Sequence, residues 1–537
     1  MKKKYETLHP DAPLLYPDHP LPVTRRDFLR QGLISGMGVT LGGSVLNLFA
    51  NPKAAHAALS SDLTTLAGTL SNSCTLGGAG NNPVPVICFD LAGGANIAGS
   101  NVLVGTNTQS DLLTTAGYSK LGLPGDMIPG GVEPAGFSQT GTSNGDFTDT
   151  TLGLQFHTDS AFLRGILEKF TDATARAQVN GAIIPARSDN DTGNNPHNPM
   201  YGIAKAGANG GIVTLVGSRN SDSGGNSMAP ANMIDPEIRP TKVDQPSDVT
   251  GLVDTGNLTG ILSEKDDVVA VMESIARISN NKLNQIDTQI TADAVVKDLV
   301  RCGYLKAADI ADRFANVQID PALDGRIVDG VDTNFAGTGI FTSTEFNGDR
   351  EFRKTASVMK MVLDGHAGVG TISMGGYDYH TGNRANGEVR DLRAGRCMGA
   401  CLQYAAANRT PLLMYVFSDG SLASNGMIDN STDGRGKGVW TGDNSSTAAS
   451  MMIYYDPNAL ARPIVLRDQI GWFRSDASVD TSSSAVANNV NLLTEAVILN
   501  YLALQNRTSD YGALFGGLGS SAAALDPYIA FNPLTGF

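Results

Sequence analysis

Short apolar runs bounded by turn residues alternate along the chain with longer segments of helical periodicity. The runs at 84–89, 370–374 and 412–417 are continuous, which is typical of strands buried on both faces of a sheet. Shorter apolar runs at 182–185 and 211–216 favour two further strands. Because these runs alternate with helices, the pattern predicts an α/β fold with a largely parallel central sheet flanked by helices.

Helical spacing of apolar residues is clearest from Val268 to Val317, and further helices are expected over 161–170, 352–363, 392–407 and 486–504. Two stretches, 105–150 and 186–260, are rich in Gly, Ser, Asn, Asp and Thr and show little periodicity. We expect them to be long loop insertions. No internal repeat and no clean linker is evident, so residues 58–537 are predicted to form a single large domain.

The amino end carries the features of a twin-arginine export signal. Arg25 and Arg26 precede Phe28 and Leu29, and a glycine-rich apolar stretch follows. Ala55-His56-Ala57 then forms a small-x-small cleavage site. The alternative is a chance Arg-Arg pair before a core helix. The signal hypothesis predicts cleavage after residue 57, the twin-arginine translocase as a partner during export, and a location in the periplasm or outside the cell.

The chain is acidic, with a formal net charge of −14. Residues 1–57 carry seven basic and four acidic side chains, so the remainder carries about −17. Such a balance argues against nucleic acid or an anionic membrane as a partner and suits a surface that attracts cations. After the signal, no segment is apolar enough to be an integral membrane span.

Five cysteines lie beyond the signal, and an odd number leaves at least one thiol unpaired within the chain. Cys397 and Cys401 are four residues apart on an expected helix and share a face, which fits either metal binding or small buried side chains. Cys88 lies in an apolar strand and is predicted to be in the core. The spacing does not define a disulfide framework.

Polar residues follow three of the expected strands directly. Asp90 ends the first, Asp378 and His380 follow the second, and Asp419 follows the third. Ligands in parallel sheets gather beyond the carboxyl ends of strands, so these side chains form a candidate cradle for a divalent cation. The alternative for each aspartate is a helix cap or a turn. Asp429 and Asp433 begin like a calcium loop, but Trp440 stands at its twelfth position, so we expect only an acidic turn.

The motif Gly375-Gly376-Tyr377-Asp378-Tyr379-His380, followed by a strand ending in Ser418-Asp419-Gly420, resembles a bacterial family of uncharacterised secreted proteins with twin-arginine signals. That family is related to the alkaline phosphatase and sulfatase superfamily. Its motifs are Gly-Gly-Phe-Asp-x-His, a strand ending in Ser-Glu-Phe-Gly, and Asn-x-x-x-Gly-Thr-Asp-His-Gly. The resemblance spans most of residues 84–475 and implies an alkaline phosphatase-like fold.

In that superfamily, Asp and His side chains at strand ends hold divalent metals that polarise a phosphate or sulfate ester. The resemblance implies that Asp378, His380, Asp419 and Asp443 are metal ligands. Asp90 joins them as a candidate ligand from its place at the first strand end. It also implies a role for His197 in proton transfer or in binding the substrate oxyanion. The chain departs from the family pattern at two positions, where Asn444 replaces a histidine and Asn96 an acidic residue.

These departures leave a site dominated by oxygen ligands with one imidazole. Such a site suits calcium, magnesium or manganese better than zinc, which prefers imidazole and thiolate. Two hypotheses follow. One is a metal-dependent hydrolase acting on a small-molecule or polymer ester of phosphate or sulfate. The other is a non-catalytic binding or assembly component of the cell envelope on a degenerate hydrolase fold, acting with a co-expressed partner.

Overall fold

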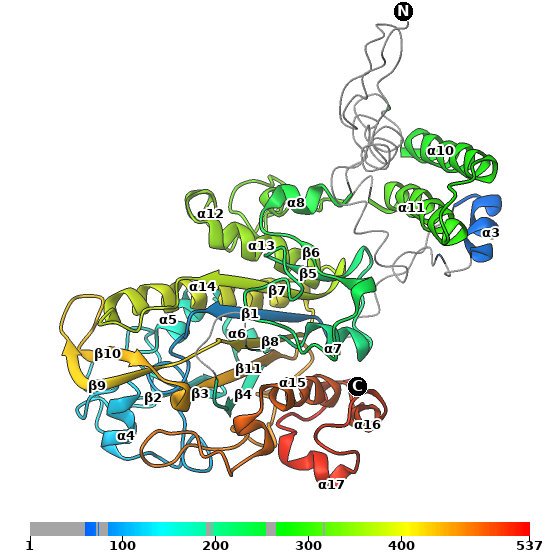
Figure 1. Cartoon of the computed structure of the whole chain (residues 1–537). Helices are drawn as coiled ribbons and strands as arrows, with labels where there is room; N and C mark the ends of the chain where they lie inside the picture. The colour runs from blue at the N-terminus through cyan, green and yellow to red at the C-terminus, as the bar shows by residue number, and fades with distance from the viewer. Residues whose placement is uncertain are drawn as a thin grey trace, which may run out of the picture.

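The computed structural model describes residues 59–70, 74, 84–188, 195, 197–253, 262, 265–314 and 317–536. The export signal predicted over 1–57 lies outside the described residues. The described chain is an α/β structure built on one seven-stranded sheet with helices on both faces (Figure 1). Among these residues, no helix is both long and apolar enough to cross a membrane.

The central sheet is mixed, which corrects the expectation of a largely parallel one. Its order is β4-β11-β8-β1-β7-β5-β6. The pairs from β8 to β6 are parallel, whereas β11 runs antiparallel to both β8 and β4. The strands are β1 (Val86–Ala92), β4 (Val179–Pro185), β5 (Val213–Gly217), β6 (Thr241–Lys242), β7 (Ala367–Gly375), β8 (Leu412–Phe417) and β11 (Ala449–Tyr455).

Strand β1 at the centre shows why these runs are apolar throughout. Its side chains alternate between two cores, because successive residues of a strand point to opposite faces. Ile87 and Phe89 join the core beneath the helices on one face, whereas Val86 and Cys88 join the core on the other. Burial on both sides leaves no position for a polar side chain until the strand nears its carboxyl end.

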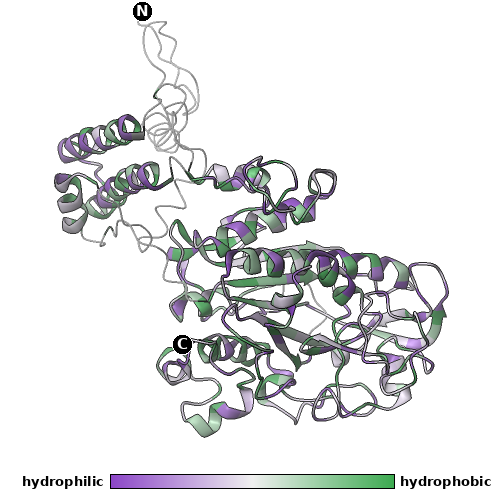
Figure 2. Ribbon diagram, turned by 180° about the vertical axis from the view of Figure 1, so that it is seen from behind, coloured by the Kyte–Doolittle hydropathy of each residue, from purple (hydrophilic) through white to green (hydrophobic). Residues whose placement is uncertain are grey.

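The helices divide between these two faces. On the first face lie α5 (Ala161–Lys169), α13 (Arg350–Leu363) and α14 (Arg384–Asn408), and on the second lie α7 (Met200–Lys205) and α15 (Val490–Leu504). Figure 2 shows apolar residues concentrated in the strands and in the helix faces that cover them. Cys397 and Cys401 are buried free thiols of α14. Burial raises the pKa of Cys397 to about 12, so these cysteines are core residues.

A small helical cluster forms a core of its own. It comprises α3 (Ser61–Thr69), α10 (Lys265–Gln285) and α11 (Asp293–Phe314), and it is set apart from the sheet in Figure 1. A disulfide joins Cys74 to Cys302 of α11 across 228 positions of sequence. The cysteine spacing had not indicated this pairing.

Smaller elements complete the chain. Two hairpins, β2 (Thr148–Leu152) with β3 (Leu154–His157) and β9 (Leu422–Asp429) with β10 (Lys437–Asp443), are antiparallel. Asp429 and Asp433 lie at the turn of the second hairpin, as expected of an acidic turn. The remaining α-helices of the described residues are α4 (Thr115–Lys120), α6 (Ala173–Arg176), α8 (Pro246–Thr250), α12 (Ser343–Gly348), α16 (Tyr511–Leu514) and α17 (Ala522–Leu525).

Candidate functional site

Three parallel strands bring polar residues to one edge of the sheet. β1 lies between β7 and β8, and its Asp90 pairs in register with Ser373 and Phe417. The loops that follow all three strands therefore begin at the same edge. This arrangement places the predicted residues after β7 and β8 close to those after β1, as the rule for parallel sheets requires.

Asp378, His380 and Asp443 form a group that could hold a metal ion. One ligand atom from each lies within 4.8 Å of the other two. His380 Nε2 is 2.9 Å from Asp378 Oδ1 and 3.9 Å from Asp443 Oδ2. All three side chains reach solvent, and the imidazole is 29% exposed. The described residues thus assemble two carboxylates and one imidazole at an accessible position.

The third member of this group comes from a distant part of the sequence. Asp443 is the last residue of β10, and it pairs with Leu422 at the start of β9. Because β9 follows β8 after a short loop, the hairpin returns Asp443 to the edge where β8 ends. Partial burial raises the pKa of Asp443, and the nearby charges of Asp378 and Asp419 add to this effect while His380 opposes it.

Asp419, also predicted as a ligand, is not one of the three residues of this group, and it is almost fully buried, at 1% exposed. Its Oδ1 accepts a hydrogen bond of 2.7 Å from the backbone amide of Gly93. Its Oδ2 is also buried but has no hydrogen-bond partner among the described residues. A buried carboxylate oxygen without a partner is costly, and a bound cation is one way to satisfy it.

Gly93 is the point at which the loops after β1 and β7 touch. Its φ is +125°, a left-handed conformation, and a Cβ there would lie 2.4 Å from the Asp378 backbone nitrogen. The Tyr377 amide also donates to the Ala92 carbonyl over 3.1 Å. Only glycine permits this approach, so the Gly-Gly loop sets the position of Asp378.

Ser418 anchors the same loop from β8. Its Oγ accepts hydrogen bonds from the amides of Gly94 and Ala95 and donates to the Leu91 carbonyl. No role was predicted for Ser418 from the sequence. The only available signal was its place between a buried strand and Asp419. The hydroxyl is a structural clamp between the ends of β1 and β8.

Asp90 is not part of the three-residue group. Its Oδ2 accepts hydrogen bonds from the amides of Asn226 and Ser227, and its Oδ1 accepts one from Ser227 Oγ. Burial raises the pKa of Asp90 to about 6, against the opposing effect of these hydrogen bonds. In this geometry the carboxylate holds the loop at 226–227 against the sheet edge. A loop was expected in this region, but its contact with Asp90 was not predicted from the sequence.

His197 is buried, 3% exposed, and stacks on Phe417 at a centroid distance of 5.8 Å. Its Nε2 is 3.4 Å from Ser188 Oγ, which itself donates to the Asp419 carbonyl over 2.7 Å. Because the Ser188 hydroxyl donates its proton to the Asp419 carbonyl, it can only accept from His197. The neutral ring therefore carries its proton on Nε2, which leaves Nδ1 as an acceptor. Nδ1 has no partner among the described residues. Burial lowers the pKa of His197 to about 4, so the ring is neutral at pH 7.

Two other histidines serve the fold. His157 contacts the Met127 carbonyl through Nε2 and accepts from the Asp159 amide through Nδ1. His366 precedes β7 and packs edge-on against Phe314. It lies at the opposite end of that strand from Asp378, so it does not share the candidate site.

A basic cavity of about 660 Å³ opens at the carboxyl ends of β5, β6 and β7. It reaches Gly375, three residues before Asp378, and Asn226, whose amide binds Asp90. Its charged lining comprises the basic side chains of Arg219, Lys242, Arg350 and Lys354 and the acidic side chains of Asp244 and Glu351. The lining therefore has a positive balance on a chain whose net charge is −14.

Comparison with protein-family models, with curated proteins and with solved structures finds no match to this chain. The chemistry of the site therefore follows from the side chains that form it. The group offers two carboxylates and one imidazole, so most of its possible ligand atoms are oxygens. Oxygen-rich sets favour calcium, magnesium or manganese, and the described cysteines lie elsewhere, in the core or in the disulfide.

Proposed function

We propose that this chain is an exported protein of the alkaline phosphatase and sulfatase type that binds a hard divalent cation and hydrolyses an ester of phosphate or sulfate. The observation that carries the proposal is the convergence of Asp378, His380 and Asp443, with ligand atoms within 4.8 Å of one another, at the carboxyl edge of the sheet. The family resemblance of the surrounding motifs supplies the reaction class.

Asp378, His380 and Asp443 would hold the ion, and the unpartnered Oδ2 of Asp419 would complete or support the set. A cation bound there would supply Lewis-acid stabilisation of the ester oxygens. His197 contributes a neutral imidazole with an acceptor Nδ1, as a proton acceptor requires. Asp90 and Ser418 position loops and do not take part in the chemistry.

The basic cavity supports an anionic substrate. Lys354 is nearly buried. Its ammonium group donates to the Ser373 carbonyl over 2.7 Å and pairs with the Glu351 carboxylate over 2.8 Å, which fixes it at the end of β7. Arg219 donates to Asn226 Oδ1 in the loop that Asp90 holds. Positive side chains beside the candidate metal group would attract an ester that carries negative charge and orient it.

Export is supported by the disulfide between Cys74 and Cys302. Disulfides persist in oxidising compartments such as the bacterial periplasm and are rare in the cytoplasm. Together with the twin-arginine motif at Arg25 and Arg26, this pairing favours a periplasmic or secreted protein.

The proposal is tested by purifying the exported form, measuring its metal content, and assaying aryl phosphate and aryl sulfate esters. Each assay is run with EDTA and after restoring calcium, magnesium or manganese. We expect turnover of at least one ester that EDTA abolishes and one of the ions restores. Absence of both ion binding and turnover would refute the hydrolase.

The second candidate is a non-catalytic binding component of the envelope. Its specific support is that the hydroxyls of Ser418 and Ser188 each donate to a backbone carbonyl, so neither is poised as a nucleophile. Stoichiometric binding of a divalent ion without turnover of any ester would favour this function over the hydrolase.

A further inference from the structure

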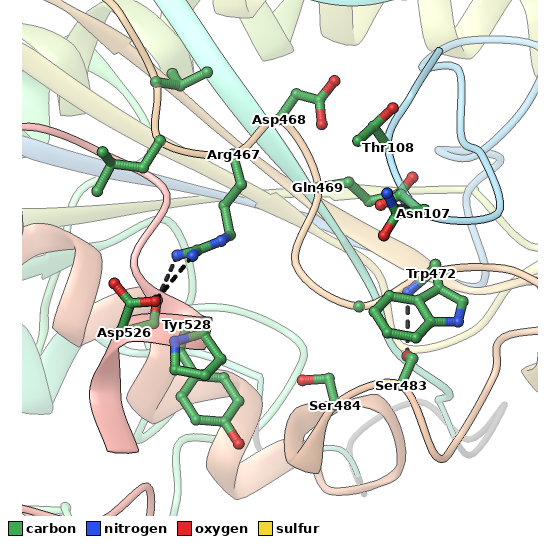
Figure 3. A pocket seen from close by; sticks show the side chains of 14 residues that line it. Asn107, Thr108, Arg467, Asp468, Gln469, Trp472, Ser483, Ser484, Asp526 and Tyr528 are labelled. Atoms are coloured by element: carbon green, nitrogen blue, oxygen red, sulfur yellow. Dashed lines mark hydrogen bonds and ion pairs between the residues drawn. The ribbon is translucent and has the colours of Figure 1, made fainter. Parts of the chain in front are cut away.

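A second cavity, of about 580 Å³, lies beside the β4 edge of the central sheet (Figure 3). The segment around Gln469 forms its floor and pairs in parallel with Ile183 of β4. The volume falls within the range of about 300–1,000 Å³ that small-molecule sites occupy. Its lining combines aromatic, carboxylate and amide side chains from four separate segments, including Asn107, Asp468, Gln469, Trp472, Asp526 and Tyr528.

The walls of this cavity are held by hydrogen bonds independent of any ligand. Gln469 accepts from the Gly105 amide over 3.1 Å and donates back to the Gly105 carbonyl over 3.0 Å. Arg467 donates to the Asp526 carboxylate over 3.2 Å and to the backbone carbonyls of Asp526 and Ile529. The backbone amide of Trp472 donates to Ser483 Oγ over 3.1 Å. A binding surface formed in advance loses little conformational entropy when a ligand arrives.

The charges of the lining exclude several ligand classes. Among the described residues that line the cavity, Arg467 is the one basic side chain, against the carboxylates of Asp468 and Asp526. This negative balance disfavours phosphate, sulfate and nucleic acid. The part of the lining that the structure describes contains neither histidine nor cysteine, which disfavours transition metals. Among uncharged ligands, the rings of Trp472 and Tyr528 and the polar side chains around them fit a molecule with many hydroxyl groups and flat apolar faces.

We propose that this cavity binds a neutral oligosaccharide. The C–H faces of sugar rings pack against the partly buried rings of Trp472 and Tyr528. Sugar hydroxyls donate to the carboxylate of Asp468 and exchange hydrogen bonds with the amide of Asn107. This binding does not depend on the hydrolase proposed above.

The cavity is nevertheless linked to the candidate metal group. The loop that follows Trp472 is held at Val479, whose amide donates to the Ser446 carbonyl over 2.8 Å. Ser446 lies three residues beyond Asp443. A glycan bound at Trp472 is thus held by a loop that is hydrogen-bonded to the loop after Asp443.

Intrinsic fluorescence provides a direct test, because the chain has only two tryptophans. Trp440 is 1% exposed and packs beneath Arg384, at 4.6 Å from the ring centroid, so a change in emission reports on Trp472. The exported protein is titrated with maltohexaose, cellohexaose, laminarihexaose and chitohexaose. We expect a saturable change with at least one of them, with a Kd below about 1 mM.

Calorimetry then measures the same hexasaccharide against variants whose folding is checked by circular dichroism. Trp472→Ala and Tyr528→Ala should each weaken binding at least about tenfold, whereas Trp472→Phe, which keeps a ring, should stay within about threefold. Phe335→Ala removes an exposed aromatic ring outside the cavity and should leave the Kd unchanged. Asp378→Asn should also leave it unchanged, which separates this site from the proposed metal group.

Three results would overturn the proposal. The first is no binding of any of the four hexasaccharides. The second is binding that neither Trp472→Ala nor Tyr528→Ala weakens. The third is binding confined to a charged polymer such as dextran sulfate, since the net negative lining would not select it.

Discussion

The backbone amide of Gly93 donates a 2.7 Å hydrogen bond to Asp419 Oδ1, which ties the loop after β1 to the end of β8. The same glycine faces the backbone nitrogen of Asp378 at a distance that leaves no room for a side chain. One small residue thus sets the spacing between a buried carboxylate and the exposed group that could hold a cation.

Replacing Gly93 with alanine should displace the Asp378 loop. The new Cβ would lie 2.4 Å from Asp378 N, at a φ of +125°. We expect a loss of at least about 2 kcal/mol in the free energy of unfolding, together with weaker cation binding. Urea unfolding and calcium or manganese titration by calorimetry measure both effects.

The matched control is Gly136→Ala. Gly136 also has a positive φ, of +76°, but a Cβ there meets nothing within 4 Å. The Gly136→Ala variant should lose stability through backbone strain alone, and its affinity for the cation should be unchanged. Equal cation affinity in Gly93→Ala and the unsubstituted protein would contradict the role assigned to this contact.

Asp378→Asn and Asp443→Asn should each lower the affinity for a divalent cation at least about tenfold, because cation affinity follows the number of charged oxygen ligands. Both residues are exposed enough for the fold to tolerate the change. Calorimetric titration of the metal-free protein measures the effect. Asp433→Asn, in the exposed turn between β9 and β10, removes the same charge elsewhere and should bind as the unsubstituted protein does. A similar loss in all three variants would indicate nonspecific attraction.

Acid should destabilise the fold through its buried neutral histidines. Burial lowers the pKa of His157 to about 4 from an ordinary value near 6.5, so the unfolded chain binds a proton at a pH where the folded chain does not. The stabilisation that the neutral His157 contributes is fully present above pH 6.5 and is lost as the pH falls towards 4. Between pH 7 and pH 5 we expect the free energy of unfolding to fall by roughly 2 kcal/mol through His157.

Urea unfolding at pH 7 and pH 5 measures this dependence. His157→Phe removes the titrating group and keeps the stacking on Phe147. This variant should lose less stability between the two pH values, although it starts lower because the contact with the Met127 carbonyl is gone. An unchanged difference between the two pH values would show that His157 is not responsible.

The disulfide should leave three titratable thiols. Cys88, Cys397 and Cys401 are free and buried, whereas Cys74 and Cys302 are bonded to each other. We expect Ellman's reagent to detect three thiols in denaturant and five after reduction. Detection of five thiols in denaturant without reduction would refute the disulfide between Cys74 and Cys302.

Loss of the bond should act on the cluster of α3, α10 and α11. Cys302→Ser is expected to lower stability by about 2–4 kcal/mol and to expose α10 and α11 to limited proteolysis first. The fragment that contains the central sheet should persist, since its two cores do not include Cys302. Simultaneous cleavage of the helical cluster and of the fragment with the central sheet would contradict the view that the two have separate cores.

Apolar runs predict the strands well where both faces are buried. The run at 412–417 coincides with β8, because every residue of that strand packs into a core. Strand β11 was not recognised, and its reversed direction changes the sheet from largely parallel to mixed. A strand buried on both faces has the same apolar pattern in either direction, so the pattern cannot reveal its orientation.

The candidate site was predictable in parts. Asp378 and His380 are two positions apart after one strand, and their closeness follows from local sequence. Asp443 joins them only because the β9–β10 hairpin folds back, and Asp90 turns instead toward Asn226 and Ser227. Asp90, Asp378 and Asp443 thus take their places according to which loops reach them.

The amino-acid sequence by itself determined the α/β alternation, the buried strands and the polar residues that end them, because burial on both sides permits only apolar side chains within a central strand. It also placed Asp378, His380 and Asp419 directly after two of those strands. Only the tertiary structure decided which carboxylates meet, that Cys74 bonds Cys302, and that Trp472 and Tyr528 share a cavity. These contacts join residues far apart along the chain, and their distances depend on how the whole structure packs.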